Sequence, residues 1–285
     1  MKTKTRVIGA VLALGVVAAS VVFAQQRIRS NRGGFDGTYG GSAVPDTSDR
    51  KGVPDWQIDP QFKSDVFTFV RLKWQSYRFS DVWMTDFPDS ELNFSFRLQQ
   101  LTSMKVNPQP RWLEITSEEL ADYPFVYMLE VSSLQFSDEE AAALRKYLLN
   151  GGFLMVDDFW GEAAWRNFAD EMKKVFPDRE AIELPLEHPI FHCVYDLKEK
   201  PQIPGIDTAM QYKGTDITWE KSDAKEAHYK AIFDDKGRIM VVICHNTDLG
   251  DGWEREGEDE YYFRRFSEKF AYPLGINIVF YAMTN

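Results

Sequence analysis

The sequence is poor in the residues that usually mark a thiol or zinc centre. It has only two cysteines, Cys193 and Cys244, and four histidines among 285 residues. No complete pair of nucleophile and base and no metal-ligand spacing can be identified from the residue order. The two cysteines would form a single disulfide if the fold brings them together in an oxidising compartment, or would otherwise act as small apolar residues. The metal ligands, if any, stay unassigned at this point.

Positive charge is also scarce. The chain carries 44 acidic and 33 basic residues, for a formal net charge of −11. Loss of residues 1–24, which contain Lys2, Lys4 and Arg6, would change this value to −14. A strongly acidic surface repels the phosphate backbone, so the composition argues against a nucleic-acid partner. A neutral or cationic partner fits better.

A long apolar run occurs at the N-terminus, over residues 7–23. It follows three basic residues and ends at Ala24, a pattern that predicts a signal peptide of residues 1–24. The alternative is an uncleaved anchor, since a run of 17 residues is close to the shortest that spans a bilayer. Both interpretations predict an exported protein, in the periplasm or on the extracellular face of the membrane.

The rest of the chain divides into a tether and one domain. Residues 25–53 are rich in glycine and polar residues, which predicts a flexible tether with a possible membrane attachment through an uncleaved leader. Residues 54–285 are long enough to bury a sizeable core and show no internal repeat. We expect them to form a single domain.

Apolar runs and helical patterns alternate along this domain. We expect strands at residues 66–72, 112–115, 125–129, 153–156 and 181–184, and a hairpin of residues 231–233 and 239–243. Helices are expected to begin near Ser90, at residues 116–120, after Ser137, and over residues 161–176, 261–270 and 273–281. In the helix that begins near Ser90, Leu92, Phe96, Leu98 and Leu101 are expected on or near one face. Residues 185–225 lack a clear period and predict an insertion with short strands. The pattern favours an α/β fold, a three-layer α/β/α sandwich whose mostly parallel sheet carries an antiparallel hairpin near the C-terminus.

Four segments, residues 86–94, 151–158, 187–191 and 245–248, together resemble the bacterial family known as domain of unknown function 4159. The resemblance implies a fold similar to the class I glutamine amidotransferase-like group, with flavodoxin-like topology, and an exported location. Those amidotransferases use a cysteine nucleophile on a tight glycine-flanked turn. Nothing around Asp157 or Cys193 reproduces that turn, so the catalytic triad is not carried over.

Two adjacent acids, Asp157 and Asp158, follow the apolar run 153–156 directly. Ligands of open α/β sheets bind outside the carboxyl ends of the strands, and Glu130 ends the preceding strand. Such carboxylates can share a proton, bind a hard cation or hold sugar hydroxyls. The competing interpretation is that one acid caps the next helix and the other pairs with a basic residue.

His245 follows the second strand of the expected hairpin and precedes Asn246 and Asp248. It is a candidate general base or metal ligand, or alternatively a satisfied loop histidine. Because Pro189 separates His188 from His192, we expect His188 to order a loop rather than to bind zinc on a helix. The acidic run of residues 248–260 lacks the ligand spacing of an EF-hand, and a solvated face is favoured over a calcium loop.

An aromatic and acidic loop follows the first expected strand. Its carboxylates, arginine and rings suit stacking on a sugar, or alternatively cap the next helix and cover the sheet edge. The residues assigned to ligand binding are Arg71, Trp74, Asp86, Glu130, Trp160, Asn246 and Asp248.

Two functions compete. The first is an exported, non-catalytic ligand-binding or assembly domain that recognises a polar small molecule, a glycan or a partner protein at the strand ends. The second is a hydrolase of glycan or cell-wall amide bonds in which Asp157 or Asp158 works with His245, with a divalent cation as an optional cofactor. No other cofactor is predicted. The hydrolase requires Asp157 or Asp158 within about 8 Å of the His245 ring across a concave site. Both functions assume that Glu130, Asp157 and His245 leave their strands on one rim.

Overall fold

The computed structural model describes residues 46–62, 65–78 and 81–285. They form an α/β fold around a seven-stranded sheet in the order β2-β1-β3-β4-β7-β6-β5. The strands are β1 (Val70–Lys73), β2 (Arg111–Glu114), β3 (Phe125–Leu129), β4 (Phe153–Asp157), β5 (Ile182–Glu183), β6 (His228–Phe233) and β7 (Ile239–His245). Strands β2, β1, β3, β4 and β7 are parallel, and β6 runs antiparallel to both of its neighbours. The predicted fold class and the C-terminal hairpin are therefore confirmed.

The strand order reverses between β1 and β3. The chain passes from β1 to β2 at one edge of the sheet, and then returns to place β3 on the other side of β1. The loops that leave two neighbouring strands in opposite directions open a crevice at this point, which is where open α/β sheets bind ligands. The carboxyl ends of β1 and β3 thus frame the region where a site is expected.

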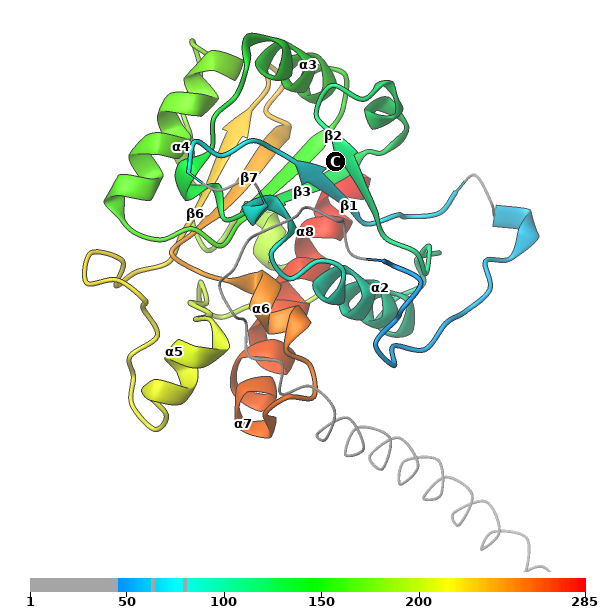
Figure 1. Cartoon of the computed structure of the whole chain (residues 1–285), viewed down its shortest axis with the longest axis vertical. Coiled ribbons are helices and arrows are strands. Elements are labelled where there is room, and N and C mark those ends of the chain that lie inside the picture. The colour runs from blue at the N-terminus through cyan, green and yellow to red at the C-terminus, as the bar shows by residue number, and fades with distance from the viewer. Residues whose placement is uncertain (1–45, 63–64, 79–80) are drawn as a thin grey trace, which may run out of the picture.

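The long helices cover both faces of the sheet. They are α2 (Asp89–Leu101), α3 (Asp138–Leu149), α4 (Glu162–Val175) and α8 (Tyr272–Thr284). In Figure 1, α3 lies at the top and α4 at the upper left, whereas α2 and α8 lie nearer the centre. Shorter helices complete the fold: α5 (Ile206–Gln211), α6 (Leu249–Glu254), α7 (Glu260–Tyr262) and the π-helix η7 (Phe263–Ala271), with 3₁₀ turns η2 (Pro60–Phe62), η3 (Val82–Met84), η4 (Glu118–Asp122), η5 (Val131–Ser133) and η6 (Pro189–Phe191).

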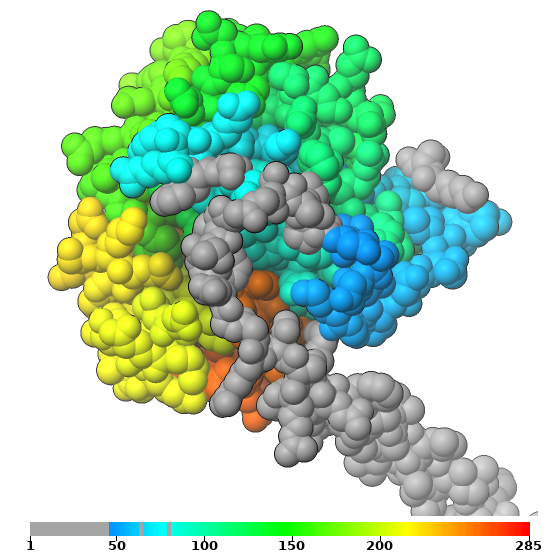
Figure 2. Space-filling model, in the orientation of Figure 1, coloured from blue at the N-terminus to red at the C-terminus, as the bar shows by residue number. Residues whose placement is uncertain are grey.

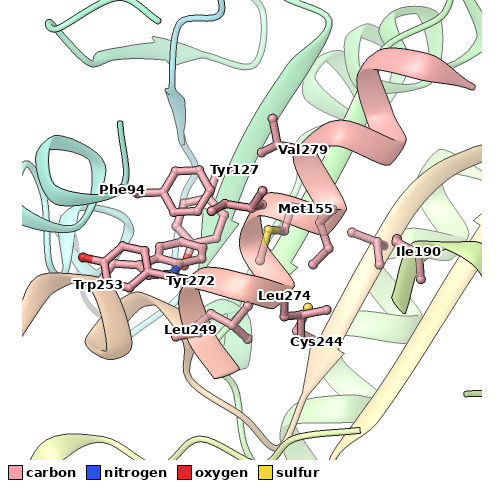
Figure 3. Close-up of a cluster of buried hydrophobic side chains, with 14 of the residues drawn as sticks. Phe94, Tyr127, Met155, Ile190, Cys244, Leu249, Trp253, Tyr272, Leu274 and Val279 are labelled. Carbon is pink, nitrogen blue, oxygen red and sulfur yellow. The ribbon is translucent and has the colours of Figure 1, made fainter. Parts of the chain in front are cut away.

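Alternation along the strands divides the core into two layers. In β4, Phe153 and Met155 belong to the layer beneath α2 and α8, whereas Leu154 and Val156 belong to the layer beneath α3 and α4. Every residue of β3, β4 and β7 is buried, because helices cover both of their faces. Figure 3 shows the first layer, in which Leu274 and Val279 of α8 lie over Met155. The direction of each side chain at a strand end follows from this alternation.

The capping signal of α3 is confirmed in detail. The Ser137 side chain accepts the N–H of Glu140, and the Glu140 carboxylate accepts the N–H of Ser137. Ala141, Leu144, Tyr147 and Leu148 are buried as predicted. For α4, Phe168, Met172 and Val175 are buried, and Trp165 is partly exposed. Local capping and apolar spacing were sufficient for these two helices.

The predicted buried face of α2 is partly wrong. Phe94 is fully buried, Phe96 is only half-buried and Leu101 is 50% exposed. The polar residues Ser90, Glu91 and Ser95 lie on the buried face beside Phe94, so the buried face of α2 does not show up as a regular apolar period in the sequence. Phe94 faces the core because its ring packs on Trp253, with ring centroids 4.6 Å apart.

The insertion also differs from expectation. Within residues 185–225 the structure has η6 and α5 but no strand. This segment forms the yellow part of the surface in Figure 2. Its prolines and glycines break the chain into short turns, which prevents a ladder from extending. The acidic run after β7 is a solvated face only in its second half: Asp248 and Asp251 are buried, whereas Glu258 and Glu260 are exposed.

The N-terminal segment and the two cysteines complete the description of the chain. The signal peptide or anchor of residues 1–24 and the tether up to residue 45 lie outside the described residues. Among residues 46–53, Val53 is buried and Arg50 donates to the Pro108 carbonyl, so contacts with the domain begin before residue 54. No helix in the described ranges is long and apolar enough to cross a bilayer. The considered disulfide is not formed, since Cys193 and Cys244 are both free thiols.

Candidate functional site

Carboxyl groups from several segments gather at the carboxyl ends of the parallel strands. Asp86 lies in the loop after β1, Glu130 follows β3, Asp157 ends β4, and Asp248 follows β7. We call the set Asp86, Glu130, Asp157, Asp158, Glu220, Asp248, Asp251 and Glu254 the acid cluster. Burial, and after it repulsion from other members of the cluster, raises the pKa of six of these carboxyl groups: Asp86, Glu130, Asp158, Glu220, Asp248 and Glu254.

Asp157 is the most enclosed member, with no exposed surface. Its Oδ2 accepts hydrogen bonds from the Tyr127 hydroxyl at 2.9 Å and from the backbone N–H of Leu249 at 2.9 Å and of Gly250 at 3.0 Å. Its Oδ1 is buried and has no hydrogen-bond partner among the described residues. Burial raises the pKa of Asp157 to about 7, although these donors act in the opposite direction.

Glu130 and Asp158 are joined through their backbones. Leu129 pairs with Asp157 in the sheet, and the next N–H, that of Glu130, donates to the Asp158 carbonyl at 3.1 Å. Both residues have left-handed backbones, with φ of 56° and 49°, and Asp86 has φ of 63°. Non-glycine residues in this conformation are strained and concentrate at functional sites. Burial, then repulsion from Asp86, raises the pKa of Glu130 to about 7, and burial raises that of Asp158 well above its usual value.

The tightest group within the cluster is Asp86, Asp251 and Glu254. One carboxylate oxygen of each lies within 4.8 Å of the others. Asp86 and Glu254 are close enough for a carboxyl-to-carboxylate hydrogen bond. Burial raises the pKa of Asp86 to about 7 and that of Glu254 to about 11. Two carboxylates at this separation cannot both stay charged without a proton or a cation between them.

Two glycines allow the carboxylates to approach one another. A methyl group at Gly250 would lie 2.9 Å from Asp86 Oδ2 and 3.1 Å from the Tyr127 hydroxyl. A methyl group at Gly205 would lie 2.9 Å from Glu220 Oε1 and 3.2 Å from Asp251 Oδ2. Both positions therefore need a residue without a side chain.

The basic residues nearby do not balance these acids. Arg71 is fully buried and is committed to Glu91, with 2.5 Å between Nη2 and Oε1. Its remaining donors bond Ser90 and the carbonyls of Trp83 and Thr85. Arg255 contacts Asp251 and Glu254, and Lys221 donates to the Trp160 carbonyl. The acid cluster therefore contains more carboxyl groups than the basic side chains around it can neutralise.

His245 lies apart from the acid cluster. Val156 pairs with Ile243, so Asp157 lies beside Cys244, and His245 points to the opposite face of the sheet. Its ring packs against Phe159 and Trp165, with centroids 4.8 Å and 5.4 Å away, and its Nε2 lies 3.2 Å from the Gly161 carbonyl. Burial lowers its pKa to about 4. The rim expected for Glu130, Asp157 and His245 thus holds for the backbones but not for the histidine side chain.

The other residues assigned to ligand binding have three different positions in the structure. Asp86, Glu130 and Asp248 belong to the acid cluster. Trp160 is buried and donates to Asp158 Oδ1 at 3.1 Å, which positions that carboxylate. Arg71 and Trp74 are buried, and Trp74 donates to the Leu129 carbonyl at 3.1 Å. Asn246 Oδ1 accepts the Gly161 N–H and Nδ2 donates to the Glu226 carbonyl. Arg71, Trp74 and Asn246 therefore hold loops in place.

The structure also shows the local contacts of His188 and of the acids that were considered as helix caps. His188 caps η6 by accepting the Ile190 N–H at 3.2 Å, which confirms that it orders a loop. Asp157 caps a helix, but that helix is α6 rather than the α4 that follows it in sequence. Neither Asp89 nor Ser90 caps α2, whose N-cap is Pro88.

Three acids of the cluster were not assigned to ligand binding from the sequence: Glu220, and Asp251 and Glu254 of the acidic run 248–260. A signal for one of them was present, because Asp248 and Asp251 have the spacing of an N-cap and its N3 residue. Asp248 Oδ1 does accept the Asp251 N–H at 2.7 Å. The density of acids in this run pointed to a solvated loop instead. Glu220 lies in the segment without a period and has no local signal.

One comparison with known proteins gave a match. Residues 68–283 match the family described as "Domain of unknown function (DUF4159)". No match was found among curated proteins.

Proposed function

This chain belongs to the DUF4159 family, and from the geometry of its strand ends we propose that it is an exported ligand-binding domain whose binding site is the acid cluster. The ligand is a polar small molecule, and a cationic group on it would meet the carboxylates. A glycan or a partner protein that presents basic groups is the competing ligand class. Binding here involves no chemical step.

The observation that carries this proposal is the convergence of eight acids on the reversal of strand order, with too few cations to balance them. Burying carboxylates without counter-charges costs free energy, because water is removed from each charge and like charges are brought together. A stable fold keeps such an arrangement at a ligand site, where the ligand supplies the missing positive charge. The left-handed backbones of Asp86, Glu130 and Asp158 support the same location.

We further propose the class I glutamine amidotransferase-like fold, with flavodoxin-like topology. The order of the five parallel strands supports it, since β2-β1-β3-β4-β7 corresponds to the 2-1-3-4-5 order of that topology. In such sheets the ligand lies beside the first and third strands, which here carry Asp86 and Glu130 at their ends. The proposal of export rests on the basic and apolar pattern of residues 1–24.

Binding without hydrolysis is favoured by the position of His245. The hydrolase requires this histidine as a partner of Asp157 or Asp158, but its ring packs between Phe159 and Trp165 beneath α4. The acids lack the base that the reaction requires. A carboxylate pair alone would still bind a cation or hydroxyl groups.

A thermal-shift experiment tests the proposal on the full chain. The probes are spermidine as a polar cation, calcium chloride, and a neutral oligosaccharide, each against sodium chloride of equal ionic strength. A ligand at 100 times its Kd stabilises the folded state by about 2.7 kcal/mol, which raises Tm by roughly 5–10 °C for a domain of this size. We expect at least one probe to do so.

Two variants locate the effect. Asp251→Asn removes one charge from the acid cluster, whereas Asp235→Asn removes one from a hairpin turn where the side chain is 90% exposed. The shift should shrink in the first variant and persist in the second. Equal shifts in both variants, or no shift with any probe, would overturn the proposal.

A further inference from the structure

We propose that Asp86, Asp251 and Glu254 bind one divalent cation of the calcium type, through one carboxylate oxygen each. The inference rests on the ligand-binding function proposed above and deepens it, because it names the ion that part of the acid cluster would hold. Asp86 comes from the loop after β1, and Asp251 and Glu254 are the third and the last residues of α6.

The separation of the three oxygens suits a cation of this size. All lie within 4.8 Å of one another. Calcium binds oxygen at 2.3–2.6 Å, so two ligands on opposite sides of the ion are about 4.6–5.2 Å apart and adjacent ligands are closer. Magnesium requires shorter bonds in a strict octahedron, and zinc prefers nitrogen and sulfur. An all-carboxylate set suits a hard cation, and calcium accepts the irregular geometry of three protein ligands and water more readily than magnesium does.

A second observation is independent of the three acids. Asp157 is fully buried, and its Oδ1 has no hydrogen-bond partner among the described residues. Its Oδ2 accepts the N–H of Gly250, the residue whose Cα is approached by Asp86 Oδ2. The carboxylates of Asp157 and Asp86 therefore both contact Gly250. A calcium ion keeps water in its coordination shell, and a bound water is the donor that Asp157 lacks.

The local charge agrees with a divalent ion. Arg255 Nε lies 3.1 Å from Asp251 Oδ1 and 2.8 Å from Glu254 Oε2, and neutralises one of the three carboxylates. Arg71 does not contribute, because Glu91 already balances it. When all three carboxylates are ionised, they carry two negative charges more than Arg255 balances, and one divalent cation neutralises these.

The three acids are not sealed in the core, because Asp86 and Glu254 are half-buried. Gly250 and Gly205 let the carboxylates of Asp86 and Asp251 approach the backbone closely. The competing arrangement is a proton shared between Asp86 and Glu254, with Arg255 as the sole cation.

Two measurements on the full chain separate these arrangements. After treatment with a chelator, calcium is titrated calorimetrically at pH 8, and terbium, a luminescent calcium substitute, is titrated with excitation of tryptophan. Trp253 is buried and adjacent to Glu254, so it is placed to sensitise bound terbium. We expect one strong site per chain in both titrations, with calcium displacing terbium.

The test variant and its control each remove one carboxylate that contacts Arg255. Glu254→Gln removes a proposed ligand, and Glu258→Gln removes an exposed partner of the same arginine, whose carboxylate lies 3.2 Å from Nη1. Loss of a metal-site interaction lowers affinity by at least about tenfold. We expect this loss for Glu254→Gln and for Asp251→Asn, and less than about a threefold change for Glu258→Gln. Circular dichroism confirms that each variant is folded, and Asp86→Asn provides a third ligand variant if one of the others is not.

The outcomes also separate this inference from the proposed function. Absence of calcium and terbium binding up to about 10 mM, roughly ten times the weakest Kd of calcium sites in proteins, or binding unaffected by the three ligand variants, overturns the cation site. If spermidine or the oligosaccharide still stabilises the chelated protein through the acid cluster, the proposed function survives that result. If no probe binds, both fail.

Discussion

The carboxylate of Asp157 accepts the backbone N–H of Gly250 at 3.0 Å, and so ties the end of β4 to the first turn of α6. Gly250 in turn lies against Asp86 from the loop after β1. One carboxylate therefore holds together a strand, a helix and the neighbouring acid. The link predicts that Asp157 matters for stability as well as for the shape of the acid cluster.

Asp157→Ala should destabilise the protein much more than Asp157→Asn. Alanine removes the acceptor of three hydrogen bonds and leaves two buried N–H groups unpaired, at about 1–3 kcal/mol for each unsatisfied group. Asparagine keeps an acceptor oxygen. Urea unfolding at pH 7 measures the difference, and similar midpoints for both variants would show that these bonds are unimportant.

Asp157→Asn should also change the pH dependence of stability. The pKa of Asp157 is raised to about 7, so this group takes up a proton on folding between pH 4 and 7. Its contribution to stability is therefore complete near pH 4 and is lost as the pH rises to about 7. Without divalent ions, the free energy of unfolding of Asp157→Asn should fall less steeply in this window, by up to about 1.4 kcal/mol per pH unit. Parallel profiles for variant and wild type would contradict the assignment.

His245→Phe should make the protein more resistant to acid. The folded pKa of His245 is about 4, below its unfolded value of about 6.5, so burial favours the neutral ring. This stability is full above pH 6.5 and is lost as the pH falls to about 4, by roughly 3 kcal/mol in total. Phenylalanine cannot take up a proton, and urea midpoints at pH 7 and pH 5 should differ less than in the wild type.

The same variant tests the separation of His245 from the acid cluster. Its response to spermidine or calcium in the thermal-shift experiment should equal that of the wild type. A lost response would place the histidine at the ligand site.

Gly250→Ala should weaken ligand binding without any change of charge. The added methyl group would lie 2.9 Å from Asp86 Oδ2, so that the carboxylate must move, at about 1–3 kcal/mol in stability. Gly214→Ala is a control for the added methyl group, which would meet no atom within 4 Å there. The φ of +83° at Gly214 makes this substitution strained, so the control tests binding and not stability. Thermal shifts with the ligand of the wild type should fall for Gly250→Ala only. Unchanged binding in Gly250→Ala would show that the convergence of Asp86 is not required.

Arg71→Met should destabilise the fold by about 3–5 kcal/mol, because it leaves the buried Glu91 carboxylate without its partner. Lys73→Met, two residues later on the same strand, breaks an exposed ion pair with Glu114 and should cost less than about 1 kcal/mol. Denaturant titrations compare the two. Equal costs would mean that the Arg71–Glu91 pair does not support the loop.

The elements that the sequence predicted correctly are those with a signal inside their own residues, such as a cap or an unbroken apolar run. The capping box of Ser137 and Glu140, and the uninterrupted apolar runs of β3 and β4, belong to this class. The location of the site was also predictable, because carboxylates directly after buried parallel strands must emerge at one edge. Asp157, Asp158 and Glu130 met there as expected.

Contacts between distant segments were not predictable in this way. The side of the sheet that His245 faces depends on the pairing of β7 with β4, and a shift by one residue would reverse it. Asp251 and Glu254 are buried because α6 docks onto Asp157, which lies more than ninety positions earlier in the chain. A local window over residues 248–260 contains acids and glycines but not this partner.

Five separate stretches of chain, from residue 86 to residue 254, each supply part of the acid cluster. In the unfolded chain these acids are isolated and bind ions only as ordinary solvated carboxylates do. A ligand that needs several of them at once therefore binds the native state alone, and its concentration sets how much of the protein remains folded. The abundance of the active form would then follow the supply of that ligand in its surroundings.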